Sequence, residues 1–277
     1  MKHRMTNPFV YVGIIVILCI TLFPVMWMVS TAFKHNSAVF DMPPQWIPVH
    51  PTLSAFSSVL HDYSGFLTYM GNSFLVCTLS TILTIAASSI AGYAFSRYRY
   101  RGLKSLLILI LATQMIPSAV LLLPLYVMYQ HFGLLNSYLG LILVYTTFSL
   151  PFAIWMMKGF YDTVPKELEE AAWVDGMGKF GTLFRITLRL VTPGIMAVAL
   201  FSFLTGWNDL MFALTFNTVP SLRTIPPGIQ LSYVGQYMYY WSSMMAASVI
   251  ITIPIVILFI FFQRYLVKGL TMGAVKG

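Results

Sequence analysis

The sequence is poor in charged residues, which make up only 9% of its 277 positions, against 58% for hydrophobic residues. Soluble domains carry a charge at about a quarter of their positions, so this chain is not expected to be a soluble domain. It has only two cysteines, Cys19 and Cys77, and both lie in apolar stretches. A thiol in such a stretch behaves as a small hydrophobe, so neither a disulfide framework nor a cysteine metal site is expected.

Motifs of common catalytic sites are also missing. No Gly-x-x-x-x-Gly-Lys-Ser/Thr segment occurs, which excludes ATP hydrolysis by a phosphate-binding loop of that kind. The histidines show no metal-ligand spacing with cysteines or carboxylates, and no Gly-x-Ser-x-Gly segment is present. We therefore expect a protein that is not an enzyme and that has no catalytic residue, cofactor or metal site.

The sequence does contain long runs that are nearly free of charge. Each can supply the roughly 20 apolar residues with which a helix crosses a bilayer. We expect an all-α polytopic membrane protein with one transmembrane domain over residues 1–277 and six spans, near residues 9–33, 68–96, 105–130, 135–158, 192–216 and 244–263. The first span is expected to be retained, because its run is too long for the core of a signal peptide.

The basic residues predict the orientation of these spans. If both termini are cytoplasmic and six spans alternate, only Lys34 and Arg223 of the 16 lysines and arginines lie outside. Such a bias is typical of the positive-inside rule. The net charge of +8 is thereby explained by topology, and no nucleic-acid partner is expected.

A polar segment near residues 160–191 separates the fourth and fifth expected spans. Pro165 favours the first turn of a helix there, the glutamates that follow suit the positive helix end, and Gly176 can end the helix. The spacing of three and four gives this short helix one narrow face, formed by Leu168, Ala171, Ala172 and Asp175. Such a face allows another surface to approach the backbone closely.

This segment resembles the cytoplasmic EAA loop of ABC importer permeases. The pattern of that loop is Glu-Ala-Ala, three residues, Gly, nine residues, Ile, one residue and Leu-Pro, and the positions in register here are Glu170, Ala171, Ala172, Gly176, Ile186 and Leu188. Arg189 replaces the usual proline, and Pro193 could supply the turn instead. The resemblance implies a helix that couples the chain to a separate ATPase through Glu170, Ala171, Ala172, Asp175 and Gly176.

One ionisable residue, Asp209, lies within the fifth expected span. A charge at that depth costs several kcal/mol unless it faces a polar cavity or a partner. The run Trp207, Asn208, Asp209 is similar to a signature of sugar-type ABC permeases, which makes these residues, with Gln114, candidates for a substrate pathway. The alternative is that Asn208 and Asp209 join helices by hydrogen bonds.

The C-terminal run of residues 263–277 is similar to the tail of the sugar-permease subfamily that contains the smaller maltose permease subunit. The resemblance thus covers nearly the whole chain. It implies an ABC type I importer permease for a di- or oligosaccharide, multi-pass in a bacterial or archaeal plasma membrane. The implied partners are a cytoplasmic ABC ATPase dimer, a second homologous permease, an extracytoplasmic solute-binding protein, membrane lipid and the sugar.

Other functions remain open at this point. An ABC permease for glycerol phosphate or another small solute has the same architecture, but an anionic ligand favours basic residues in the outer part, where Arg223 is the candidate. A stand-alone secondary transporter or channel is expected to carry several buried ionisable groups or broken helices in two matching halves. A membrane scaffold predicts no solute-dependent activity.

Overall fold

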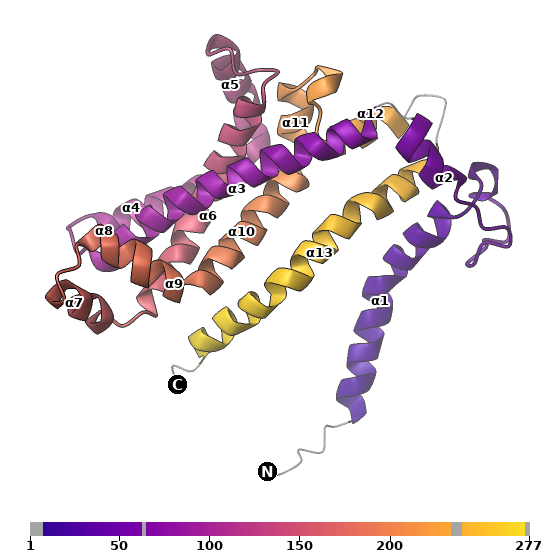
Figure 1. The fold of residues 1–277 in the computed structure, drawn as a ribbon. Coiled ribbons are helices and arrows are strands. Elements are labelled where there is room, and N and C mark those ends of the chain that lie inside the picture. The colour runs from indigo at the N-terminus through magenta and orange to yellow at the C-terminus, as the bar shows by residue number, and fades with distance from the viewer. Residues whose placement is uncertain (1–7, 63–64, 234–239, 275–277) are drawn as a thin grey trace. The chain divides into compact units, whose positions relative to one another are not determined.

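The structure, a computed structural model, describes residues 8–62, 65–233 and 240–274. Every regular element in these ranges is a helix, and they contain no strand (Figure 1). The all-α fold class is therefore confirmed. Several residues on which the sequence predictions bear lie outside the described ranges: Lys2, Arg4 and Lys276.

The chain forms two compact units. The first comprises residues 1–66 and 229–253, and the second comprises residues 67–228 and 254–277. The long helix α13 (Trp241–Ala274) runs from the first unit into the second.

The first unit consists mainly of two apolar helices and the loop that follows the first of them. Its elements are α1 (Pro8–Ala32), the 3-10 helix η1 (Asn36–Ala38), α2 (Ser54–Ser57), the π-helix η2 (Ser58–Asp62) and the first part of α13. Nearly all apolar side chains of α1 are exposed, as expected of a helix that faces lipid. The loop folds back on the end of α1, where the Trp46 ring lies 5.2 Å from that of Trp27.

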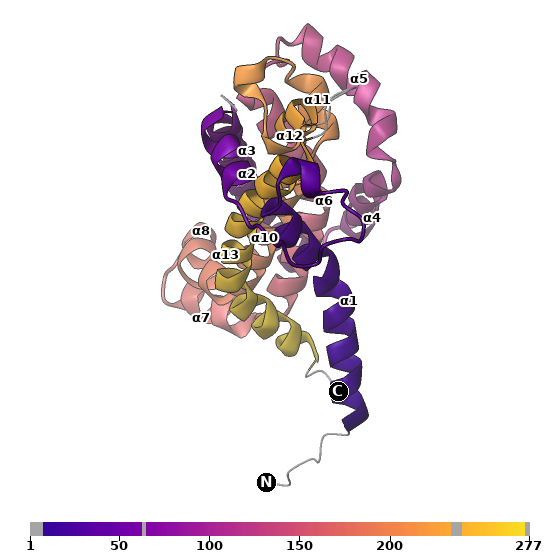
Figure 2. The ribbon, with the colours of Figure 1, turned by 90° about the vertical axis from the view of Figure 1, so that its right-hand side faces the viewer.

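The second unit contains most of the helices. They are α3 (Phe66–Arg97), α4 (Leu103–Ala112), η3 (Thr113–Met115), α5 (Ser118–His131), α6 (Tyr138–Asp162), α7 (Glu167–Val174), α8 (Lys179–Thr182), the π-helix η4 (Leu183–Thr187), α9 (Leu188–Leu190), α10 (Thr192–Trp207), α11 (Met211–Phe216), η5 (Pro220–Leu222) and α12 (Ile225–Tyr233), which continues into the first unit. Helices α7 and α8 lie at one end of this unit and α5 and α11 at the other (Figure 2).

Up to six membrane spans occur in the described part of the chain. Four single helices are long and apolar enough: Phe9–Ala32, Phe66–Arg97, Tyr138–Asp162 and Trp241–Tyr265. Two bent pairs also qualify if each pair is one span: Leu103–Met115 with Ser118–His131, at 95°, and Lys179–Leu190 with Thr192–Trp207, at 78°. This agrees with the expected polytopic architecture.

Prolines account for both bends. Ile116 is extended, with ψ of 121°, because the following Pro117 disfavours helical geometry in the residue before it. The second bend falls at Val191, and Pro193 lies in the first turn of α10. N–H groups of the first turn have no partner within the helix, so the missing N–H of Pro193 costs no hydrogen bond there. Pro193 thus takes the place of the proline that the EAA pattern has at Arg189.

Helices α6 and α10 pack along each other and form the centre of the second unit. Two glycines of α10 permit this close approach: a Cβ at Gly206 would lie 2.8 Å from Tyr145, and one at Gly194 would lie 2.5 Å from Phe160. Side chains at these positions would force the helices apart, because protein interiors are closely packed. The packing of α6 on α10 brings together two walls of the cavity described below.

Candidate functional site

The candidate coupling helix is α7, which the sequence predicted as a short capped helix. Its end is well defined, since Gly176 adopts a left-handed φ of +85°. The Gly176 N–H donates to the Trp173 carbonyl at 3.0 Å and the Met177 N–H donates to the Ala172 carbonyl at 2.9 Å. This pair of bonds is the Schellman arrangement, in which glycine carries no steric cost.

The surface of α7 is largely open. Of the predicted coupling residues, Glu170, Ala171, Asp175 and Gly176 are exposed, whereas Ala172 is buried. Large apolar side chains beside them are exposed as well, with 88% for Val174 and 76% for Phe180. Val174 lies on α7 and Phe180 on α8. Exposed apolar side chains on such short helices are typical of a surface that another protein covers.

Glu169 anchors α7 to the transmembrane helices. Its side chain is buried, and its Oε1 accepts a hydrogen bond from Arg97 Nε at 2.8 Å and one from the Thr187 hydroxyl at 3.3 Å. The Tyr93 hydroxyl donates to Oε2 at 2.9 Å. Arg97 in turn donates to the Val164 carbonyl at 3.0 Å. This charge-assisted cluster links α7 to the end of α3 and to η4.

Sequence reasoning did not find this anchor. It treated Glu169 only as a carboxylate of the first helical turn and Arg97 only as a basic residue at a membrane boundary. No signal in the sequence marks this anchor, because Glu167, Glu169 and Glu170 all lie in the first turn of α7 and their spacing does not show which of them is buried.

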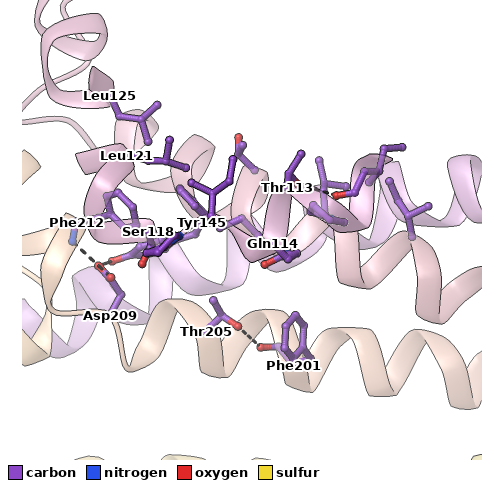
Figure 3. Close-up of a pocket in the computed structure, with 18 residues that line it drawn as sticks. Thr113, Gln114, Ser118, Leu121, Leu125, Tyr145, Phe201, Thr205, Asp209 and Phe212 are labelled. Atoms are coloured by element: carbon purple, nitrogen blue, oxygen red, sulfur yellow. Dashed lines mark hydrogen bonds between the residues drawn. The ribbon is translucent and has the colours of Figure 1, made fainter. Parts of the chain in front are cut away.

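The second candidate site is a cavity of about 770 Å³ between α4, η3, α5, α6 and α10 (Figure 3). Its wall is mostly apolar, with a few polar side chains that come from different helices: Thr113, Gln114, Ser118, Tyr145, Thr147, Thr205 and Asp209. Asp209 is the only charged residue among the described residues that line it. Its size falls within the range of roughly 300–1,000 Å³ that is typical of ligand sites.

Asp209 lies at the junction of α10 and α11, where it both lines the cavity and joins helices. Its Oδ2 accepts hydrogen bonds from the Tyr145 hydroxyl of α6 at 3.0 Å and from the Ala213 N–H at 2.9 Å. Its Oδ1 accepts a longer bond from the Phe212 N–H, at 3.4 Å. The carboxylate therefore satisfies the first N–H groups of α11 and fixes the junction to α6.

The other predicted pathway residues are placed differently. Gln114 lines the cavity, and its Nε2 donates to the Phe148 carbonyl of α6 at 2.8 Å. Trp207 is buried outside the cavity wall, with its ring 4.8 Å from that of Phe74. Asn208 is exposed and donates to the Leu204 carbonyl of its own helix at 2.9 Å. The structure thus brings Gln114 and Asp209 to one cavity and leaves Trp207 and Asn208 outside it.

The described part of the chain shows no candidate metal centre. No three histidine, cysteine, aspartate or glutamate residues among these residues are grouped so that they could hold a metal ion.

Apolar spans, a mostly apolar cavity between them with a few polar side chains, and an exposed, anchored helix at one end together define a multi-pass membrane transport protein. Residues 84–272 match the family described as "Binding-protein-dependent transport system inner membrane component". The chain belongs to this family, which confirms the resemblance seen in the sequence. It is a multi-pass inner-membrane permease subunit.

Relatives with known names match almost the full length. The sulfoquinovosyl glycerol transport system permease protein SmoH of Agrobacterium fabrum is 37% identical over 271 residues, which cover 98% of this chain and 94% of SmoH. The trehalose/maltose transport system permease protein MalG of Thermococcus litoralis is 37% identical over 267 residues, covering 96% and 95%. The diacetylchitobiose uptake system permease protein DasC of Streptomyces coelicolor is 35% identical, covering 92% of each chain.

A solved structure shows the same fold. A chain of a bacterial ABC transporter involved in the import of the acidic polysaccharide alginate superposes with a TM-score of 0.79 at 20% identity, covering 96% of this chain and 99% of the other. The permease architecture of ABC importers expected from the sequence is therefore confirmed.

Proposed function

We propose that the chain is the transmembrane permease subunit of an ATP-driven, binding-protein-dependent importer of di- or oligosaccharides. The observation that carries the proposal is the cavity of about 770 Å³ with hydroxyl, amide and carboxylate groups on an otherwise apolar wall. Sugars offer hydroxyl groups for such polar partners and apolar C–H faces for aromatic rings such as those of Tyr145 and Phe148. Relatives named for trehalose/maltose and diacetylchitobiose support this substrate class. The relative SmoH is named for a sulfonated sugar, sulfoquinovosyl glycerol, so relatives of this chain are not restricted to neutral sugars.

The charge of the cavity favours a neutral saccharide over an anionic solute such as glycerol phosphate. Asp209 is the only charged residue among the described lining residues, and it would repel an anion. Arg223 does not line this cavity, and its Nη2 donates to the Thr218 carbonyl at 3.1 Å. A phosphate or sulfonate ligand therefore lacks a cationic partner on this part of the pathway.

In this proposal, α7 lies in the cytoplasm and transmits movement from a separate ABC ATPase dimer. The exposed residues Glu170, Ala171, Asp175 and Gly176 form the docking face, and the buried Ala172 lets α7 pack closely on its own chain. The contact of Glu169 with Arg97 then carries a displacement of α7 to α3. Both chain termini are cytoplasmic in this orientation.

Two further partners complete the importer. A second, homologous permease forms the other wall of the substrate pathway, and an extracytoplasmic solute-binding protein delivers the sugar. The alginate ABC transporter that is similar in fold has been solved in complex with a pentasaccharide-bound periplasmic protein, which supports a partner of this kind. A stand-alone secondary transporter is disfavoured by the family to which the chain belongs.

The test is to co-purify the chain with its associated subunits, reconstitute them in vesicles with the solute-binding protein and screen saccharides for stimulation of ATP hydrolysis. We expect one neutral di- or oligosaccharide to stimulate hydrolysis and to accumulate in the vesicles. Recovery of a transport-active chain without any ATPase would contradict the proposal. Stimulation by glycerol phosphate alone would contradict the sugar assignment.

A further inference from the structure

A second groove of the transmembrane unit lies outside the sites described above. Its volume is about 690 Å³, and it is formed by the end of α3, the start of α4 and the end of α6. Four cationic residues line it: Arg99, Arg101, Lys104 and Lys158. No acidic residue is among the described residues of its wall.

The wall of this groove below the cations is apolar. It includes Leu107, Ile108 and Leu111 of α4 and Trp155 of α6, and the side chains of Ile108 and Trp155 are 58% and 49% exposed. Both helices belong to segments that can span the membrane. The groove therefore has a cationic rim at the membrane boundary and an apolar floor within the membrane.

We propose that this groove binds an anionic phospholipid of the cytoplasmic leaflet. The phosphate head group lies among Arg99, Arg101 and Lys104, and an acyl chain follows the apolar side of α4. Basic clusters at the cytoplasmic ends of membrane helices recognise such head groups, and long basic side chains reach from the helix to that level. The inference uses the cytoplasmic orientation of the proposed function but is independent of the sugar and of the ATPase.

The aromatic residues of the groove do not favour a nucleic-acid ligand instead. Tyr98 and Tyr100 stack on each other, with ring centroids 5.9 Å apart and planes inclined by 22°. The Lys179 ammonium lies 5.6 Å from the Tyr98 ring. Tyr98 thus contacts other side chains of the protein. The rest of the floor is apolar and mostly aliphatic, with Trp155 beside Leu107, Ile108 and Leu111, which suits an acyl chain.

A chain of polar contacts connects the groove to the coupling helix. Lys158 contacts Asp162 at 2.5 Å, and the Ser96 hydroxyl donates to the same carboxylate at 2.7 Å. Arg97 donates to Ser96 at 3.2 Å and to Glu169 of α7 at 2.8 Å. Lys158 lines the same groove, so a head group that also reaches it would compete with Asp162 and act on the residues that hold α7.

The experiment is a lipid titration of the purified full chain in detergent, read by native mass spectrometry. The probes are phosphatidylglycerol, phosphatidylcholine and inorganic phosphate. The groove variant combines Arg99→Gln, Arg101→Gln and Lys104→Gln, all at exposed positions. The control variant combines Lys166→Gln, Arg185→Gln and Arg189→Gln, which removes the same charge from exposed positions outside the groove.

We expect phosphatidylglycerol to bind in preference to phosphatidylcholine and to phosphate. The groove variant should lose on the order of 100-fold in affinity, since each basic residue near the surface contributes roughly fivefold, and the control variant should lose little. The single variant Lys104→Gln should lose about fivefold on the same basis, which keeps the test valid if the triple variant fails to fold.

Three results would overturn the proposal. Equal losses of phosphatidylglycerol affinity in both triple variants would mean that the lipid is attracted by the overall positive charge and not by this groove. Equal affinity for inorganic phosphate and for lipid would mean that the apolar floor takes no part. Protection of Lys104 from an amine reagent by a partner subunit in the assembled complex, with no phospholipid retained, would mean that the groove is a protein interface.

Discussion

At the scale of single residues, Glu169 ties the candidate coupling helix α7 to α3 and η4. A buried carboxylate is tolerated only when its oxygens are satisfied, and here Arg97, Tyr93 and Thr187 all donate to it. Side-chain exposure is only 9% for Arg97 and 2% for Glu169. Water therefore has little access to this ion pair, and the pair holds α7 in one position relative to α3.

Replacing Arg97 with leucine should destabilise the purified chain by about 3–5 kcal/mol, because Glu169 would keep a buried charge without its cation. The double variant Arg97→Leu with Glu169→Leu should recover much of this loss, since no unpaired charge remains. Thermal unfolding in detergent measures both. The exposed neighbour variant Glu170→Gln is the control and should stay within about 0.5 kcal/mol of the natural chain. Unchanged stability of Arg97→Leu would show that the ion pair is not formed.

A second residue, Asp209, tests whether the cavity is a substrate pathway or only a packing defect. Asp209→Ala should cost about 1–2 kcal/mol of stability, because α11 loses its N-terminal acceptor and the Tyr145 hydroxyl loses its partner. If the carboxylate also faces the sugar, the saccharide concentration that half-stimulates ATP hydrolysis should rise as well.

The matched control for Asp209→Ala is Tyr145→Phe, which removes the hydroxyl that donates to Asp209 but leaves the carboxylate in the cavity. We expect it to lower stability by about 1 kcal/mol with a smaller effect on the saccharide response. An equal shift of that response in both variants would favour a purely structural role for Asp209.

At the scale of the elements, Gly176 ends helix α7 with a left-handed backbone conformation. Gly176 has a φ of +85°, and a Cβ there would meet no atom within 4 Å. A side chain at Gly176 therefore introduces backbone strain of roughly 1–2 kcal/mol but no clash within the chain. Because the residue is exposed, the side chain would project toward whatever docks on α7.

Gly176→Leu should therefore insert into the membrane normally but fail to couple ATP hydrolysis to uptake. Gly178→Leu is the matched control, since Gly178 is also exposed with open space around its Cβ but has an ordinary φ of −72°. Membrane fractionation and sugar uptake in cells measure the two effects. Normal uptake by Gly176→Leu would argue against a docking role for the end of α7.

The elements also show what the sequence can and cannot predict. The long helices follow from apolar run length, and the end of α7 follows from Gly176. Pro165 does not lie in the first turn of α7, as predicted, but precedes Lys166, the N-cap residue of this helix. Pro117 by itself predicts a kink but not the 95° break seen there, because a proline fixes the local geometry but not the direction of the next helix. The anchor between Arg97 and Glu169 was not predicted, since its partners are 72 residues apart and only the packing of α3 beside α7 brings them together.

The candidate pathway residues show the same limit. Trp207, Asn208 and Asp209 are consecutive, yet only Asp209 lines the cavity. The reason is that α10 ends at Trp207 and α11 begins at Met211, so three neighbouring side chains point in different directions. A motif identifies the region, but the helix ends decide which residue faces the cavity.

For the whole molecule, the central claim is that α7 lies in the cytoplasm and contacts a separate ATPase. Orientation rests on the distribution of basic residues, and the contact rests on the exposed face of α7. Both can be examined in one labelling experiment on vesicles of defined sidedness. A cysteine-free background requires replacement of Cys19 and Cys77.

The most direct measurement is labelling of Glu170→Cys by a membrane-impermeant thiol reagent. We predict labelling in inside-out vesicles, protection when the ATPase is bound and no labelling in right-side-out vesicles. Val49→Cys, in the exposed loop after α1, should show the opposite sidedness. Labelling of Glu170→Cys in right-side-out vesicles would contradict the orientation and, with it, the account of α7 as the coupling helix.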